Sequence, residues 1–226
     1  MLIAAAVCPH PPLLVPEIAQ GAAEELDAVR AAGDRAVAGL LGSGADEVVV
    51  IGAGEQNREY GPDAGGGLAA YGPPVDVGPP PPVLPLSLTI GRWLAERSGG
   101  RPSRYAEIAA DTPPQECLVR GAELAAAAPR VAALVMGDGS ARRTEESPGR
   151  VDSRALAFDE SVAEALAKAD LQALASLDPG VADELMAAGR PAWQVLAGAA
   201  EGAGLRGRLL RHEAPYGVGY FVALWS

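Results

Sequence analysis

Short apolar runs recur along the chain and predict buried strands. The run that ends at Ile51 (Asp46-Glu-Val-Val-Val-Ile) is apolar at consecutive positions, as expected for a central strand that is covered on both faces. Similar runs occupy residues 2–7, 105–110 and 131–136, and two closing strands are predicted at 205–212 and 217–224.

Between these runs, apolar residues recur near every 3.6 positions, which predicts amphipathic helices. Helices are expected at residues 16–41, at 84–97, after Thr112, and over 153–204 with a restart at Asp178-Pro179. Asp178 is a favourable N-cap residue, and Thr112 with Gln115 forms the pattern of a capping box. Strands that alternate with helices predict an α/β fold, namely an αβα sandwich around a mostly parallel or mixed sheet.

Glycine and proline dominate residues 61–82, which include Gly65–Gly67 and Pro79–Pro82. This composition predicts a long loop or flap, and loops of this length in compact domains are usually functional or mobile. No repeat and no shift in composition marks a second domain, so a single domain over residues 1–226 is expected.

Charge and composition narrow the classes of function. The net charge of −11 argues against nucleic acid or an anionic membrane surface as a partner, since both attract clustered positive charge. No apolar stretch reaches the roughly 18 residues of a membrane span, and residues 1–7 lack the basic start of a signal peptide. A soluble cytoplasmic protein is therefore expected. The two cysteines, Cys8 and Cys117, form no disulfide framework or zinc pattern.

Only two histidines are present, and each follows or ends a predicted strand. His10 lies between prolines in Pro9-His-Pro-Pro, and His212 precedes Glu213 near the end of the chain. If the two strand ends share one sheet edge, His10 and Glu213 supply two thirds of the 2-His-1-carboxylate triad that binds non-haem Fe(II). In the alternative interpretation, His10 is a hydrogen-bonded loop residue and Glu213 is a surface charge.

A glycine-rich turn with polar side chains follows the strand at 131–136. Asp138, Ser140 and Arg142 lie within Gly137-Asp-Gly-Ser-Ala-Arg-Arg143, where a guanidinium beside exposed backbone N–H groups can bind an anion. The alternative is a solvated basic patch on a loop.

Four segments resemble one family, in the same order along the chain. Pro9-His-Pro-Pro-Leu-Leu-Val-Pro-Glu17 resembles the N-terminal signature of the LigB-type catalytic subunit of class III extradiol ring-cleavage dioxygenases. The closing His212-Glu-Ala-Pro-Tyr-Gly-Val-Gly-Tyr220 resembles that family's Tyr-Glu-Gly-Pro-Phe-Gly-Val-Gly-Tyr. Between them, residues 136–144 and Phe158-Asp-Glu160 resemble a Ser-Gly-Asp-Leu-Ser-His-Arg segment and a Glu-Phe-Asp-Glu segment.

The resemblance implies an αβα sandwich in which Fe(II) is held by two histidines and a glutamate, with a further histidine as acid/base toward a small aromatic substrate. His10 and Glu213 match the first ligand and the carboxylate. The second ligand histidine is replaced within Gly52-Ala-Gly54, and the acid/base histidine by Ala141. A third family histidine is replaced by prolines around Pro79–Pro81, so Fe(II) is implied by the resemblance while most of its expected partners are missing.

Two residues could compensate for this loss. Glu55 adjoins the vacant position, and its oxygen would shift the metal preference toward Mn²⁺ or Mg²⁺. His212 is a candidate catalytic residue beside His10. However, neighbours on a strand point to opposite faces, so His212 is not expected to replace the lost imidazole while Glu213 is a ligand.

Three hypotheses remain open at the level of sequence. The chain is a divergent dioxygenase-like protein that no longer cleaves catechols and keeps a crevice for a small molecule or a partner. Alternatively, it is an active metal-dependent oxidoreductase with a rebuilt site. The third hypothesis is a non-catalytic or assembly subunit, because members of this family often act as homo-oligomers or beside a second subunit.

Overall fold

A computed structural model describes all 226 residues and confirms the α/β class. Its centre is a seven-stranded sheet with the order β3-β7-β2-β8-β1-β10-β9. The strands of this sheet are β1 (Leu2–Cys8), β2 (Glu47–Gly54), β3 (Arg58–Tyr60), β7 (Arg104–Ala109), β8 (Val131–Met136), β9 (Gly207–Glu213) and β10 (Tyr220–Trp225). The four inner strands β7, β2, β8 and β1 are parallel, whereas β3, β10 and β9 each pair antiparallel with their neighbour.

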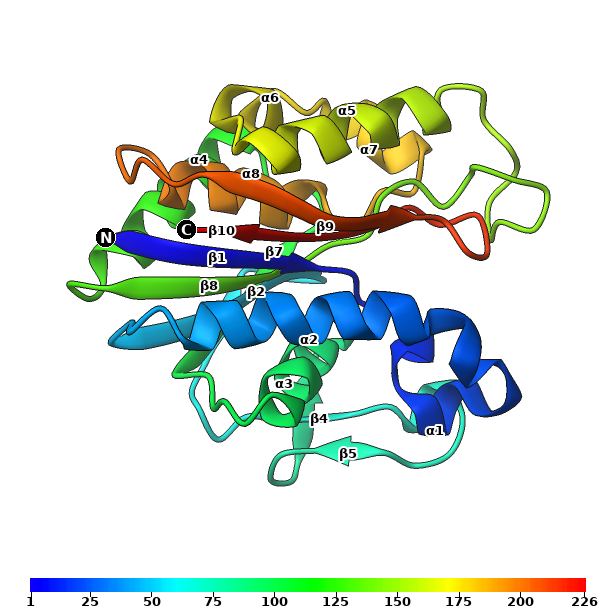
Figure 1. Cartoon of the computed structure of the whole chain (residues 1–226), viewed down its shortest axis with the longest axis horizontal. Coiled ribbons are helices and arrows are strands. Elements are labelled where there is room, and N and C mark those ends of the chain that lie inside the picture. Colours follow the sequence, from blue (N-terminus) through cyan, green and yellow to red (C-terminus); the bar gives the residue numbers. More distant parts are fainter.

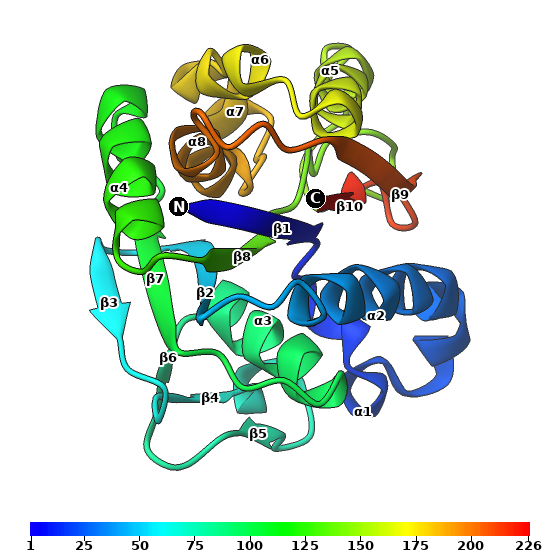
Figure 2. The ribbon, with the colours of Figure 1, turned by 60° about the vertical axis from the view of Figure 1, so that its left-hand side comes forward.

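Helices cover both faces of this sheet (Figures 1 and 2). On one face lie α1 (Pro16–Ala19), α2 (Asp27–Leu41) and α3 (Leu86–Arg97); on the other lie α4 (Pro114–Ala126), α5 (Ala155–Lys168), α6 (Leu171–Ala175), α7 (Pro179–Glu184) and α8 (Arg190–Ala199). The two faces contribute core clusters of 26 and 28 buried residues, so the inner strands are apolar on both sides. None of the helices has the length and hydrophobicity needed to cross a bilayer.

The glycine- and proline-rich segment is more ordered than the predicted flap. It forms a three-stranded sheet beside α3, with β5 (Asp76–Val77), β4 (Gly65–Gly67) and β6 (Pro82–Leu84) in that order. The buried Arg92 on α3 donates hydrogen bonds of 3.0 and 2.6 Å to the carbonyls of Pro62 and Ala64. Gly66 packs so closely on α3 that a Cβ there would meet Thr89 at 2.2 Å, which explains the glycine.

Two local predictions about helices are wrong. The helix expected at 16–41 is divided into α1, a 3-10 segment at Gln20–Leu26, and α2, because Gln20 adopts a left-handed φ of 49° that ends α1. Thr112 does not cap α4, since its hydroxyl donates to the side-chain oxygen of Asn57 at 3.0 Å. The restart at Asp178 is confirmed, because the carboxylate accepts the Val181 N–H at 2.8 Å.

Candidate functional site

His10 and Glu213 lie at the same edge of the central sheet, as the strand pattern predicts. The carboxyl ends of β1 and β8 meet there, and the antiparallel pairing of β10 with β1 and β9 brings Glu213, opposite Tyr220, to the same edge. This is the edge at which open α/β sheets usually bind ligands. Because β10 lies between β1 and β9, however, the two residues belong to strands that are not neighbours.

The His10 imidazole is paired with Asp138, which follows β8. The His10 backbone N–H donates to Asp138 Oδ1 at 2.8 Å, and Nδ1 lies 3.7 Å from Oδ2. His10 is only 7% exposed, and its Nδ1 is buried without a hydrogen bond. Burial raises the pKa of the Asp138 carboxyl, and the charge of His10 opposes that rise. The backbone hydrogen bond fixes the position of His10 beside the carboxylate, while the imidazole Nδ1 faces Asp138 at a distance too long for a hydrogen bond.

The expected metal ligands are not brought together, which corrects the predicted set of His10, Glu213 and Glu55. The Glu213 carboxylate accepts a 2.6 Å hydrogen bond from Arg211 Nε on its own strand. Glu55 is exposed, and only its backbone N–H is held in place. No group of three His, Cys, Asp or Glu side chains is close enough to hold one metal ion. The residues present therefore do not fit the Fe(II), Mn²⁺ or Mg²⁺ centre.

Gly54, where the family resemblance implies the second histidine, has no room for a side chain because Glu107 occupies the adjoining space. A Cβ on Gly54 would lie 2.2 Å from Glu107 Oε1. Glu107, on the neighbouring β7, is buried and accepts hydrogen bonds from Glu55 N–H at 2.7 Å, Gln56 N–H at 3.2 Å and Tyr60 Oη at 2.6 Å. Glycine at position 54 is thus required by a carboxylate that fastens the turn after β2.

Removing one partner of this carboxylate gives a direct measure of the Glu107 network. We expect Tyr60→Phe to lower the free energy of unfolding by about 1–2 kcal/mol, because a buried charged acceptor loses its hydroxyl donor. Urea unfolding at neutral pH provides the measurement. Tyr71→Phe, which alters an exposed tyrosine, is the matched control and should leave stability unchanged.

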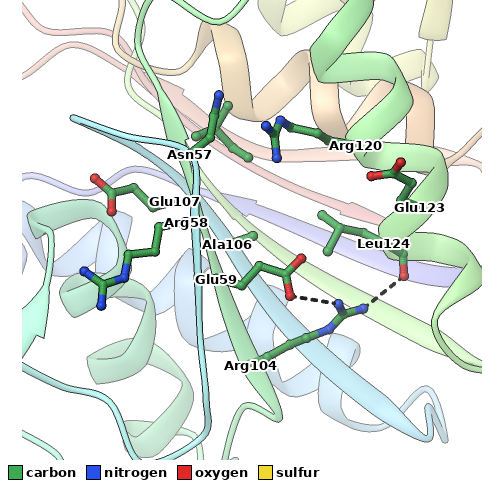
Figure 3. A pocket seen from close by; sticks show the side chains of 10 residues that line it. Asn57, Arg58, Glu59, Arg104, Ala106, Glu107, Arg120, Glu123 and Leu124 are labelled. Carbon is green, nitrogen blue, oxygen red and sulfur yellow. Dashed lines mark hydrogen bonds and ion pairs between the residues drawn. The ribbon is translucent and has the colours of Figure 1, made fainter.

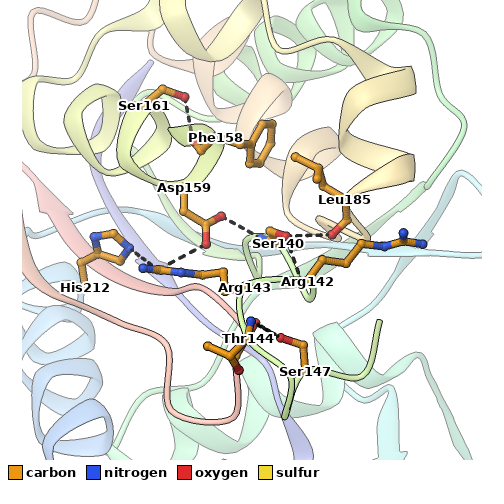
Figure 4. Close-up of polar contacts among 11 residues, drawn as sticks. Ser140, Arg142, Arg143, Thr144, Ser147, Phe158, Asp159, Ser161, Leu185 and His212 are labelled. Carbon is orange, nitrogen blue, oxygen red and sulfur yellow. Dashed lines mark hydrogen bonds and ion pairs between the residues drawn. The ribbon is translucent and has the colours of Figure 1, made fainter. Parts of the chain in front are cut away.

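The predicted anion site at Asp138, Ser140 and Arg142 is also corrected. The Ser140 side chain is fully buried, where Oγ donates to the Leu185 carbonyl at 3.1 Å and accepts from the Arg142 N–H at 3.1 Å. The Asp138 carboxylate is committed to His10. Figure 4 shows the Arg142 side chain pointing away from the serine. The turn is held by internal hydrogen bonds, so Asp138, Ser140 and Arg142 do not converge on one point as the sequence predicted. Ala141, where the family resemblance implies an acid/base histidine, is buried within the turn.

A polar cluster that the sequence reasoning missed lies behind this turn (Figure 4). Asp159 on α5 is fully buried and accepts the Ser140 N–H at 2.8 Å, while Arg143 Nη1 lies 3.4 Å from its other oxygen. Burial raises the Asp159 pKa to about 6 despite these donors. The only signal for Asp159 in the sequence is its place in the Phe158-Asp-Glu160 segment.

His212 belongs to this cluster rather than to the His10 pair. Its Nε2 lies 3.3 Å from Arg143 Nη1, and its ring stacks on Phe221 with centroids 4.8 Å apart. Because a guanidinium only donates, Nε2 must accept, which requires a neutral ring. Burial, and then the Arg143 charge, lower the pKa of His212 accordingly. Strand alternation therefore separates His212 from Glu213, as predicted.

A further hollow of about 220 Å³ lies between β3, β7 and α4 (Figure 3). Two of its three arginines are paired with acidic side chains of the protein. Arg104 contacts Glu59 at 3.5 Å and also donates to the Leu124 carbonyl. Arg120 pairs with Glu116 at 2.7 Å. The hollow is charge-balanced, so it lacks the excess charge that would attract an ionic ligand.

Comparison with known proteins supports the fold alone. No family model matches the chain, and no curated protein does so either. Among solved structures, the chain is similar to the uncharacterized protein JW3007 from Escherichia coli K12, with a TM-score of 0.61, 12% sequence identity, and 99% of each chain covered. At this identity the likeness shows a shared fold over the full length of both chains.

Proposed function

We propose that this protein is a divergent relative of the class III extradiol dioxygenases that does not cleave catechols and binds a small molecule at the carboxyl edge of its sheet. The observation that carries the proposal is the position of the buried Glu107 carboxylate beside Gly54. Its carboxylate fills the space that a side chain would need at Gly54, the position for which the family resemblance implies the second imidazole. Three of the four segments of family resemblance follow β1, β8 and β9 at this edge, and the fourth, on α5, contacts the turn after β8 through the Asp159–Ser140 hydrogen bond.

The chemistry of the remaining residues supports this proposal. Two protein ligands rarely hold a first-row divalent ion firmly, and here the Glu213 carboxylate already pairs with Arg211. The turn also lacks a histidine at Ala141, where the family resemblance implies an acid/base group, a role that typically contributes 10²–10⁴-fold in rate. His10 and Asp138 remain together at this edge as the polar groups that a bound small molecule would meet.

The test is metal retention and oxygen uptake. After anaerobic loading with Fe(II) and desalting, we expect well under one equivalent of iron, and no oxygen consumption above the buffer rate with catechols. His10→Ala and Glu213→Ala should leave the residual iron unchanged. Stoichiometric iron that is lost in both variants, together with catechol-dependent oxygen uptake, would contradict the proposal and favour the alternative of a rebuilt oxidoreductase site.

A further inference from the structure

Arg190 is a buried cation without an acidic partner. Three arginines are buried in this protein, and two of them form ion pairs, Arg30 with Asp27 and Arg92 with Glu96. Arg190 is 2% exposed and makes no ion pair. Its guanidinium donates only to neutral acceptors: the carbonyls of Thr112 (2.6 Å) and Ala110, and the Gln194 side chain (3.0 Å). A buried charge that is hydrogen-bonded but not neutralised is costly, so a nearby counter-ion would be strongly favoured.

The surroundings of Arg190 add to its positive potential. Arg190 is the first residue of α8, a ten-residue helix, and the N-terminus of a helix carries a partial positive charge. The preceding Gly189 N–H donates to the Asp138 carbonyl at 2.8 Å, which holds this helix end at the carboxyl edge of the sheet. Burial lowers the pKa of Arg190, and the more distant negative charge of Asp111 offsets this effect only in part, without forming an ion pair.

A hollow of about 180 Å³ has Arg190 among its lining residues, together with Ala110, whose carbonyl accepts a hydrogen bond from the Arg190 guanidinium. The Nε–H of Arg190 donates no hydrogen bond within the protein, so a donor remains for a ligand. Most of the wall is apolar and comes from α7, the following turn and the start of α8: Pro179, Ala182, Met186, Ala187, Ala188 and Pro191. Asp183 is the one acidic side chain of the lining, and it is exposed at the rim.

We propose that this hollow binds a small carboxylate with an apolar body, for which Arg190 supplies the counter-charge and the apolar wall contacts the remainder. A fully hydrated inorganic anion would bury its charge against the same apolar wall without compensating hydrogen bonds, so a carboxylate is the better match. The site is separate from the His10–Asp138 pair, and the inference does not depend on the loss of iron chemistry.

Benzoate is a suitable probe, with benzyl alcohol as its neutral counterpart and inorganic phosphate as the hydrated anion. Titration is followed by calorimetry and by the ¹⁵N resonance of Arg190 Nε, which reports on this guanidinium directly. We expect saturable benzoate binding that shifts the Arg190 Nε signal, with benzyl alcohol and phosphate at least tenfold weaker. Equal binding of benzyl alcohol, preferential binding of phosphate, or benzoate binding that leaves the Nε signal unmoved would overturn the proposal.

Substitutions at exposed positions around the hollow test whether the site prefers a negatively charged ligand, and they leave the buried Arg190 unchanged. Asp183→Asn, an isosteric change at the rim, should raise benzoate affinity by about two- to fivefold, the size expected for removing one exposed like charge. Ala188→Glu should lower it by a similar factor, whereas the matched Ala188→Gln should not. Lower affinity in Asp183→Asn, or equal effects of the two Ala188 variants, would show that the site does not select a negative ligand.

Discussion

Replacing Gly54 with histidine, which restores the residue type that the family resemblance implies, should destabilise the protein by about 3 kcal/mol. A Cβ at this position meets Glu107 Oε1 at 2.2 Å, and Glu107 is fixed by two backbone N–H groups and the Tyr60 hydroxyl. Overpacking typically costs about 1–3 kcal/mol, and displacing a buried carboxylate from its donors adds to that cost. Chemical unfolding of the variant at neutral pH measures the change.

A double-mutant cycle separates this clash from the general effect of a new side chain. Glu107→Ala removes the obstructing carboxylate, so Gly54→His should cost less in the Glu107→Ala background than in the wild type, with a coupling energy of about 1 kcal/mol or more. Gly61→His is the matched control, because no atom lies within 4 Å of a Cβ built there. Strictly additive effects of the two substitutions would show that Glu107 does not occupy the space of the missing ligand.

Asp159 should make the stability of the protein depend on pH between about 4 and 7. Its pKa is raised from 3.8 to about 6, chiefly by burial, so the folded state favours the protonated carboxyl. The protonated carboxyl therefore stabilises the folded state at a pH below the pKa that Asp159 has in the unfolded chain. This stabilisation is lost as the pH rises through about 6, the pKa in the folded state. The rise in pKa corresponds to about 3 kcal/mol. Asp159→Asn cannot titrate, so relative to the wild type it should gain about this amount of stability between pH 4 and pH 7.5.

Urea unfolding of both proteins across this pH range provides the measurement. The comparison uses the difference between the two proteins, because other carboxyl groups contribute to each curve; the pKa of Asp152, for example, is lowered to about 2 by Arg154. Glu160→Gln, an exposed change on the same helix, should keep the wild-type pH dependence. A difference between wild type and Asp159→Asn that stays constant with pH would contradict a raised pKa at Asp159.

The elements that the sequence predicted well are those whose signal is local. The apolar runs at 131–136 and 46–51 became the central strands β8 and β2, because continuous apolar residues can be accommodated only where both faces of a strand are covered. Asp178 caps α7 because an N-cap depends on residues three positions apart. The small sheet at residues 65–84 was missed, since glycine and proline give no strand signal, and its order comes from contacts with Arg92 and Thr89 on α3.

The site shows the same division. The sequence by itself determined the α/β class and the positions of His10 and Glu213 at predicted strand ends, because these follow from the periodicity of apolar residues. It also determined which of the histidines implied by the family resemblance are absent. The strand pairing of the folded chain brought the two ends to one edge. Only the tertiary structure decided what those absences mean. Glu107 is 53 residues from Gly54, Asp138 is 128 residues from His10, and Asp159 is 19 residues from the turn that it holds. Burial and pairing across such separations depend on packing, which no local pattern encodes.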